Sequence, residues 1–242
     1  MELLKHSTPF YAAASLYVSF IYCIKFGINY SAMIGVIVIC FSALYARNAK
    51  FVRFGAREAA KAYSVFLLAQ IASVCLLSKR VDKGLVTLLV VNALAPVVHY
   101  GSHLESFVKL YNFFKLTSFH DEIHHDLKVS RKRINVYREA QVNIFATSFL
   151  WLPPVRKYCD RTVCLFFGSL YASYHLINQR LLESPQHECH HKNKFTNLGP
   201  DYMDVLYNTK GDSQPEYCNT GVINVVVLTS IFLILKKMEP YA

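Results

Sequence analysis

The sequence lacks the patterns that mark several common classes of protein. It has no C-x-x-C pair among its seven cysteines, no motif that reads nucleic-acid bases, and no internal repeat or low-complexity stretch. The odd cysteine count, with several cysteines inside apolar runs, indicates reduced and mostly structural thiols. No small-residue cleavage site follows the first apolar run, so we expect that run to stay in the protein as a membrane anchor.

Charged residues are also scarce, and acidic ones above all. Only 17% of the 242 residues are charged, with 16 acidic against 26 basic side chains, whereas 53% are hydrophobic. This apolar content is high for a soluble protein. The net charge of +10 is concentrated between apolar runs, which suits the positive-inside rule and anionic lipid headgroups better than nucleic acid. The sequence therefore predicts a membrane protein with no nucleic-acid partner.

The expected fold class is an all-α integral membrane protein with about four transmembrane helices and a short hydrophobic hairpin. The expected spans are Phe10–Ile28, Tyr30–Ala46, Ala62–Ser78 and Gly84–Val98. The loop Arg47–Lys61 carries five cations and one anion, which favours the cytosolic side. Counting four crossings then places the N-terminus, this loop and His99 on the cytosolic face.

Three further apolar segments are shorter. Val142–Val155 and Thr162–Ile177 contain roughly 14 and 16 residues, fewer than the ~20 needed to cross a bilayer comfortably. We therefore expect a tilted or half-buried hairpin there. Gly221–Leu235 is either a short span or a helix packed on the surface of the protein.

Nine of the ten histidines lie between His99 and His191, in four groups. Neutral imidazole is the side chain that iron and zinc bind most readily. In H-Y-G-S-H and in H-E-C-H-H, residues at i and i+3 or i+4 of a helix can turn toward one point. Each group taken singly is equally consistent with interfacial or core histidines. The predicted metal ligands are His99, His103, His120, His124, His125, His175, His187, His190 and His191.

The convergence of these groups favours metal binding. Topology places all four on one membrane face, and nine imidazoles are too many for a single zinc ion. We therefore predict two metal ions on a helical, cytosolic-face site. Asp121 and Glu122 are either further ligands, acceptors for imidazole N–H groups, or part of a solvated acidic turn.

The order of these groups resembles the fatty acid hydroxylase and sterol desaturase superfamily of membrane di-iron enzymes. The shared elements are H-x-x-x-H after a transmembrane helix, an H-H pair, a short hydrophobic hairpin, a lone histidine and P-x-H-x-x-H-H. Asn135 with Arg138, His175 with Asn178, Asn197-Leu-Gly199 and D-V-L-Y-N-T from Asp204 to Thr209 resemble further elements of that family. The likeness covers roughly residues 85–212.

The chain departs from the family pattern in three places. The usual second group is H-x-x-H-H, but here Asp121 stands at its first position and His120 precedes it. Either His120 reaches the metal through a helical adjustment or Asp121 replaces it as a ligand. Tyr207-Asn208-Thr209 replaces the usual F-G-T, and an apolar run after the motif region is unusual.

The resemblance implies an enzyme that uses O2 and external electrons to hydroxylate or desaturate a lipid, such as a sterol, a fatty acyl chain or a sphingolipid. Its cofactor would be a pair of irons, with zinc able to substitute in a purified sample. It also implies the endoplasmic reticulum membrane as the location. The chain then divides into N-terminal transmembrane helices (1–84), a di-metal catalytic region (85–212) and a C-terminal apolar helix (213–242).

Electrons would have to come from a separate protein, because the sequence has no H-P-G-G haem-binding element. By family analogy this donor is of the cytochrome b5 type, with its reductase. The basic stretch Lys128–Arg138 is either a dock for an acidic donor or a surface that faces lipid phosphates.

Two other functions stay open on the sequence alone. One is a zinc-dependent membrane hydrolase, in which Glu122 or Glu188 serves as the general base. The other is an inactive family member that acts as a membrane scaffold.

Overall fold

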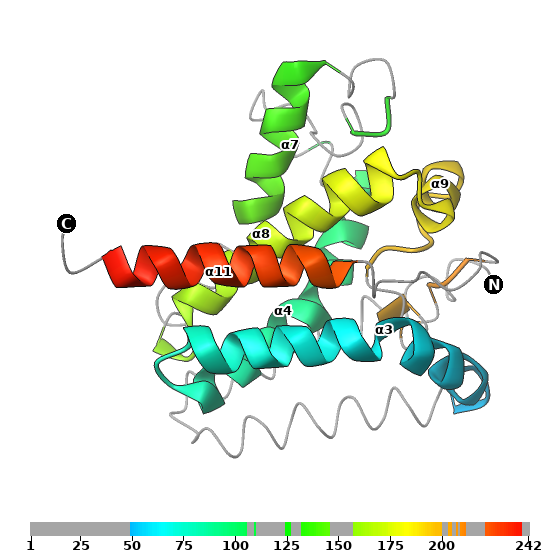
Figure 1. Cartoon of the computed structure of the whole chain (residues 1–242). Coiled ribbons are helices and arrows are strands. Elements are labelled where there is room, and N and C mark those ends of the chain that lie inside the picture. Colours follow the sequence, from blue (N-terminus) through cyan, green and yellow to red (C-terminus); the bar gives the residue numbers. More distant parts are fainter. Residues whose placement is uncertain are drawn as a thin grey trace.

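The computed structural model describes residues 49–105, 109, 124–126, 132–145, 157–199, 203–204, 207, 209–211 and 221–238. Within these ranges the chain is mostly helical and has no β-strand, as the all-α class requires. The helices are α3 (Ala49–Leu77), α4 (Val81–Ser102), α7 (Arg133–Phe145), α8 (Arg161–Tyr174), η4 (His175–Leu181), α9 (Pro185–Lys192) and α11 (Val222–Met238) (Figure 1). The spans expected at 10–28 and 30–46 lie outside the described residues, so the count of four spans stays a prediction.

Helix α3 is 29 residues long and begins at Ala49. The prediction of a loop at Arg47–Lys61 is therefore wrong for most of that stretch. Its alanine, arginine, lysine and glutamate residues have high helix propensity and it contains no proline, so the helix extends past the apolar run. Further along, Tyr63, Phe66 and Gln70 recur at helical spacing on the buried side of α3.

Helix α4 is the one described helix that is long and apolar enough to cross a membrane. Its 22 residues extend beyond the expected span at both ends, so His99 lies in its last turn and His103 caps it. The ring centroids of these two histidines are 5.4 Å apart, which confirms that they lie side by side. Pro96 lies inside the helix, and a Cβ added at Gly199 would be 2.5 Å from its Cγ. Glycine at 199 therefore allows the later chain to pack directly on α4.

Helix α8 lies at the centre of the bundle and contacts α3, α4, α7 and α11. Its N-terminus is capped by Asp160, whose Oδ1 accepts hydrogen bonds from the backbone N–H groups of Thr162 (2.9 Å) and Val163 (3.2 Å). Gly168 abuts the backbone carbonyl of Ile144 on α7, where any side chain would collide. Helix α7 includes only residues 142–145 of the first arm of the expected hairpin, and residues 146–156 lie outside the described ranges, so the hairpin stays a prediction.

The C-terminal end of α8 continues without a break into the π-helix η4. In η4 the backbone N–H of Leu182 donates to the carbonyl of Ile177, five residues earlier, at 3.0 Å. Such wide turns are found frequently at functional sites. His175 is the first residue of this turn, and Gln179 and Arg180 follow within it.

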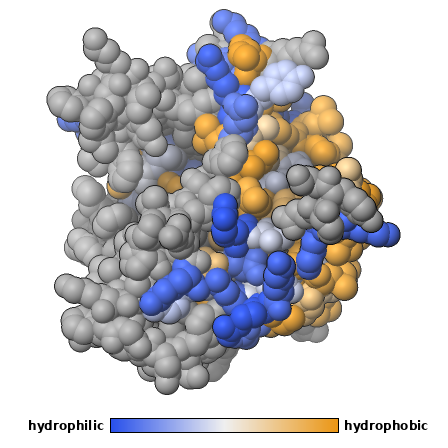
Figure 2. All heavy atoms as spheres, turned by 90° about the vertical axis from the view of Figure 1, so that its left-hand side faces the viewer, coloured by the Kyte–Doolittle hydropathy of each residue, from blue (hydrophilic) through white to orange (hydrophobic). Residues whose placement is uncertain are grey.

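Helix α11 packs along α3 and α8 and buries Val225 and Thr229 against them (Figure 1). Val222, Leu228 and Phe232 are partly buried against the same core. Most of its other apolar side chains are exposed: Ile223, Val226, Val227, Ile231, Ile234, Leu235 and Met238. Val65, Leu68 and Leu76 on α3 are exposed in the same way. Figure 2 shows hydrophobic residues gathered along one side of the molecule and hydrophilic residues at the end that faces the viewer. An apolar surface of this kind marks contact with a membrane or a partner.

Candidate metal centre

The structure brings eight of the nine predicted histidine ligands together where α4, η4 and α9 meet. They include two trios, and within each trio one ring nitrogen of every histidine lies within 4.8 Å of the others. The first trio is His99, His103 and His190, and the second trio is His124, His175 and His187. His125 and His191 lie between the trios, with ring centroids 4.6 Å apart. The ninth residue, His120, lies outside the described ranges, as do Asp121 and Glu122.

The eight-residue helix α9 contributes to both trios. His187 and His191 are four residues apart and share a face, with ring centroids 4.5 Å apart, as expected from helical spacing. His190 turns the other way, and its ring centroid lies 4.6 Å from that of His99. The H-x-x-H-H motif therefore serves two neighbouring positions and does not surround one point.

Backbone carbonyls orient two imidazoles of the first trio. His99 Nδ1 lies 2.5 Å from the carbonyl oxygen of Leu198, and His190 Nδ1 lies 2.8 Å from that of Thr196. A carbonyl oxygen only accepts, so both Nδ1 atoms carry the proton and donate. The two Nε2 atoms are then unprotonated lone-pair donors, yet they face each other at 3.1 Å. This arrangement leaves room for a positive ion that both atoms bind.

The separation of these nitrogens fits that interpretation. Two nitrogens that lie about 2.1 Å from one ion, at an angle between roughly 90° and 110°, are separated by about 3.0 to 3.4 Å. The Nε2 atoms of His99 and His190 are 3.1 Å apart. In the second trio, His187 Nε2 is 3.2 Å from His124 Nε2. His191, which lies beside this trio, has its Nε2 3.3 Å from His187 Nε2. All three distances match pairs of ligands on a common metal ion.

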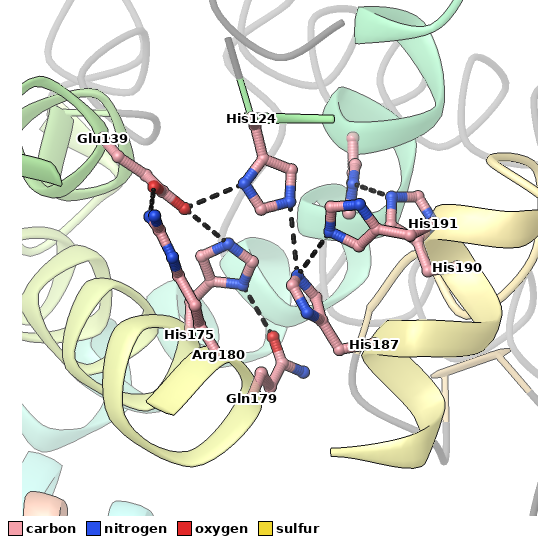
Figure 3. A network of polar contacts seen from close by, with 9 residues as sticks. His124, Glu139, His175, Gln179, Arg180, His187, His190 and His191 are labelled. Atoms are coloured by element: carbon pink, nitrogen blue, oxygen red, sulfur yellow. Dashed lines mark hydrogen bonds and ion pairs between the residues drawn. The ribbon is translucent and has the colours of Figure 1, made fainter. Parts of the chain in front are cut away.

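A buried carboxylate, Glu139 on α7, lies behind the second trio (Figure 3). Its Oε1 is 2.9 Å from His124 Nδ1 and 2.8 Å from His175 Nε2, and its Oε2 accepts a 2.6 Å hydrogen bond from Arg180 Nη1. The two imidazole contacts are short, but neither has good hydrogen-bond geometry, so they are close polar contacts between the carboxylate and the two rings. A carboxylate in this position fixes the ring and makes the opposite nitrogen of His124 a stronger metal ligand.

His175 is held on both sides. While Nε2 faces Glu139, Nδ1 lies 2.7 Å from Oε1 of Gln179, one turn further along η4. Both ring nitrogens therefore meet oxygen atoms. To bind an ion, His175 must give up one of these two contacts.

Four histidines of the site, His124, His187, His190 and His191, are held in the neutral form that metals require. Burial lowers the pKa of His124 to about 4 and that of His190 to about 2. Burial and the neighbouring imidazoles also lower the pKa values of His187 and His191. Burial by itself would raise the pKa of Glu139, but the contacts with His124 and His175 outweigh it and hold this pKa far below 4.5. At neutral pH these four imidazoles are thus neutral and the carboxylate of Glu139 is charged.

The chain that follows α9 forms a clasp under the first trio. Asp204, which is 1% exposed, accepts hydrogen bonds from the backbone N–H of Leu198 (2.8 Å), the backbone N–H of Gly199 (3.2 Å) and the hydroxyl of Thr209 (2.7 Å). Leu198 is the residue whose carbonyl orients His99. Tyr207 ties the same segment to α4, because its hydroxyl donates to the carbonyl of Ala93 at 2.9 Å. Residues far from the histidines in sequence thus fix their orientation.

A cavity opens beside the two trios and extends between α3, α4 and α8. His99, His187 and His190 line it, together with Phe66, Phe167 and Leu170 and the amides of Gln70 and Asn92. The cavity therefore places histidines from both trios next to the apolar interior of the bundle. An apolar group that entered this cavity would contact histidines of both trios.

Sequence reasoning missed Glu139, Gln179 and Arg180. The sequence offers only the four-residue spacing of Asn135 and Glu139 as a signal, and the structure shows that both are buried, at 5% and 3% exposure. Two buried polar residues on one helical face indicate an internal polar network. By contrast, Arg138, which the family resemblance singled out, is exposed. The assignment of the histidines as ligands itself stays a prediction.

No protein-family model, no curated protein and no solved structure matches the chain. The function must therefore be argued from the chemistry of the site.

Proposed function

We propose that the chain is a membrane-bound di-iron oxygenase that hydroxylates or desaturates a lipid, as members of the fatty acid hydroxylase and sterol desaturase superfamily do. The observation that carries the proposal is the pair of adjacent histidine trios whose ring nitrogens face one another at metal-ligand separations. The ring centroids of His190 in the first trio and His187 in the second are 6.4 Å apart, so ions held by the two trios would be neighbours.

The donor set supports iron over structural zinc. Imidazole nitrogens make up both trios, whereas structural zinc sites usually recruit cysteine. Cys189 lies on α9 between these histidines, but its Sγ faces the hydroxyl of Thr196 at 4.0 Å. Two bound irons would supply the oxidising power that an unactivated C–H bond requires. The chain itself would hold the ligands neutral, fix their orientation and keep water away with buried side chains.

The surface and the cavity support a lipid substrate. Helix α4 is long and apolar enough to cross a membrane, and apolar side chains are exposed along α3 and α11 (Figure 2). A substrate dissolved in the bilayer could enter between such helices and reach the histidines through the apolar cavity. We propose that the remaining expected spans anchor the chain in the endoplasmic reticulum, with the trios on the cytosolic face and a cytochrome b5-type donor and its reductase as partners.

The structure gives less support to a zinc hydrolase. That reaction requires a general base beside the metal. Glu188 is exposed and paired with Lys192 at 3.0 Å, and Glu139 is already engaged by two histidines and Arg180. The other proposed base, Glu122, lies outside the described residues.

Metal analysis combined with an oxidation assay tests the proposed function. The full chain, purified in detergent, should contain close to two irons and should consume O2 in the presence of reductase, cytochrome b5 and a lipid extract. Hydroxylated or desaturated lipid should appear in step with O2 uptake. Protein with a single zinc and no O2 uptake would favour the hydrolase, and a protein with no bound metal would favour the scaffold.

A further inference from the structure

The C-terminal apolar run, which the family pattern does not explain, forms helix α11. Its sequence contains a single amide, Asn224, whose Nδ2 donates to Oδ1 of Asn178 on η4 at 2.9 Å. An amide in an apolar helix costs free energy unless it is hydrogen-bonded. This pair therefore ties the first turn of α11 to the π-helix that carries His175.

A second contact joins α11 to the same part of the chain. A Cβ added at Gly221, the residue before α11, would lie 2.7 Å from the ring of Tyr174 and 2.9 Å from that of Phe66. These two rings have centroids 5.6 Å apart and pack in the buried cluster that includes Val225 of α11. The start of α11 thus contacts the chain on both sides of His175, one residue before it and three residues after it.

The contacts with α11 involve residues of η4 other than those that face the metal centre. His175 and Arg180 both reach Glu139 on α7, whereas Asn178 is 9% exposed and reaches α11. Turns as wide as those of η4 are rare in helices, so contacts from neighbouring helices are needed to hold this one. Loss of the contact at Asn178 would change the shape of the turn and move His175 relative to Glu139.

We infer that Asn224 is a positioning residue for the second trio, because through Asn178 it holds η4 in the conformation that presents His175 to a metal ion. The inference rests on the metal centre of the proposed function, but it does not depend on the oxidation of a lipid. The first trio should not respond, since backbone carbonyls outside α11 and η4 orient His99 and His190.

Metal binding by the full chain in detergent tests the inference without O2 or a reductant. The probe is Co2+, whose visible absorption reports binding. In His190→Ala the remaining ion is bound by the second trio, and in His187→Ala it is bound by the first. Adding Asn224→Ala should weaken Co2+ binding roughly 3- to 10-fold in His190→Ala, as the loss of one hydrogen bond predicts, and should not change it in His187→Ala.

Thr229→Val is the matched control on the same helix. The hydroxyl of Thr229 has Ser73 Oγ (2.7 Å) and the carbonyl of Val225 (2.6 Å) as partners, so its loss loosens the packing of α11 on α3 and keeps the contact with Asn178. We expect this variant to lower the melting temperature at least as much as Asn224→Ala does. It should not change the Co2+ affinity of either trio.

Linkage provides a test that needs no substitution in α11. If Asn224 raises the affinity of the second trio for an ion, an ion bound there must stabilise the contact between α11 and η4 by the same factor. Hydrogen exchange of the backbone amides of residues 225–228 should therefore slow when Co2+ binds to His190→Ala. It should not change when Co2+ binds to His187→Ala.

Three results would overturn the inference: unchanged Co2+ affinity on adding Asn224→Ala to His190→Ala, an equal loss in both backgrounds, or the same selective loss with Thr229→Val. Unchanged exchange on Co2+ binding to His190→Ala would also overturn it, even if Asn224→Ala does not fold. Absence of Co2+ binding by the wild-type protein would refute the metal centre together with this inference. Two bound ions without O2 uptake would refute the oxygenase alone.

Discussion

The two histidine trios are oriented by different kinds of group. In the first trio, His99 and His190 donate to the uncharged carbonyls of Leu198 and Thr196. In the second, His124 and His175 contact the charged carboxylate of Glu139, which Arg180 also binds. The orientation of the first trio therefore depends on where the backbone places two carbonyls. The orientation of the second trio depends on the charge of one side chain.

The two trios should therefore lose their orientation in response to different changes. A carbonyl cannot be removed by a side-chain substitution, so the first trio is sensitive to whatever holds the loop in place. A carboxylate can be neutralised by mutation or by acid, so the second trio is sensitive to charge. The carboxylate also makes its histidine a stronger ligand, which the carbonyl does to a smaller extent.

Loss of a histidine from either trio should have the largest effect. We expect His190→Ala or His187→Ala to abolish lipid oxidation and to reduce the metal content from about two ions to about one, because no neighbouring side chain can reach the same point. Elemental analysis and product formation measure both quantities. The matched control is His6→Ala, the one histidine outside the cluster in the sequence. Full activity in His190→Ala would refute the assignment of the site.

Neutralising the carboxylate should affect only the second trio. Glu139→Gln is expected to weaken binding of one of the two ions by roughly 10- to 100-fold, while the other ion stays bound. Metal titration followed by elemental analysis distinguishes weaker binding of one ion from weaker binding of both. The exposed carboxylate of Glu188, paired with Lys192, provides the control, and Glu188→Gln should bind both ions normally. Equal weakening of both ions would contradict separate anchoring.

The same carboxylate predicts a pH dependence in metal-free protein. The pKa of Glu139 is lower in the folded protein than its ordinary value of 4.5. Its contribution to stability is therefore complete above pH 4.5 and is lost as the pH falls below that value. The difference in melting temperature between wild type and Glu139→Gln should be constant from pH 7 to 5 and shrink at lower pH. A difference that grows toward acid pH would contradict the charge assignment.

Loosening the clasp should have the smallest effect of the three on activity. Asp204→Asn keeps the shape of the side chain but removes the charge that accepts from Leu198, Gly199 and Thr209. We expect a loss of roughly 1.5 to 3 kcal/mol of folding free energy, less than tenfold loss of activity, and weaker binding at the first trio only. Thermal unfolding and metal titration check these values. The control is Asp82→Asn, because Asp82 forms an exposed ion pair with Arg80. This substitution should change neither the thermal stability nor the binding of metal.

The comparison also shows which features can be predicted from sequence. Helical spacing was enough to place His99 beside His103 and His187 beside His191. Periodicity could not place Glu139, because its contact with His175 joins helices α7 and α8–η4 through tertiary packing. The carbonyls of Thr196 and Leu198 carry no signal at all, since every residue has one. The charge pattern also misled about the start of α3, because a basic stretch that resembles a loop consists of residues with high helix propensity and belongs to the helix.

The short helix α9 carries a further consequence. It has eight residues and presents ligands to both trios, so a single rigid element sets the orientation of each. An ion bound at one trio would fix α9 in place. The histidine that α9 supplies to the other trio would then lose part of its conformational freedom. The second ion would then meet ligands whose conformational entropy is already lost. The ion that binds second should therefore bind somewhat more tightly in the wild-type protein than in a variant whose other trio is empty.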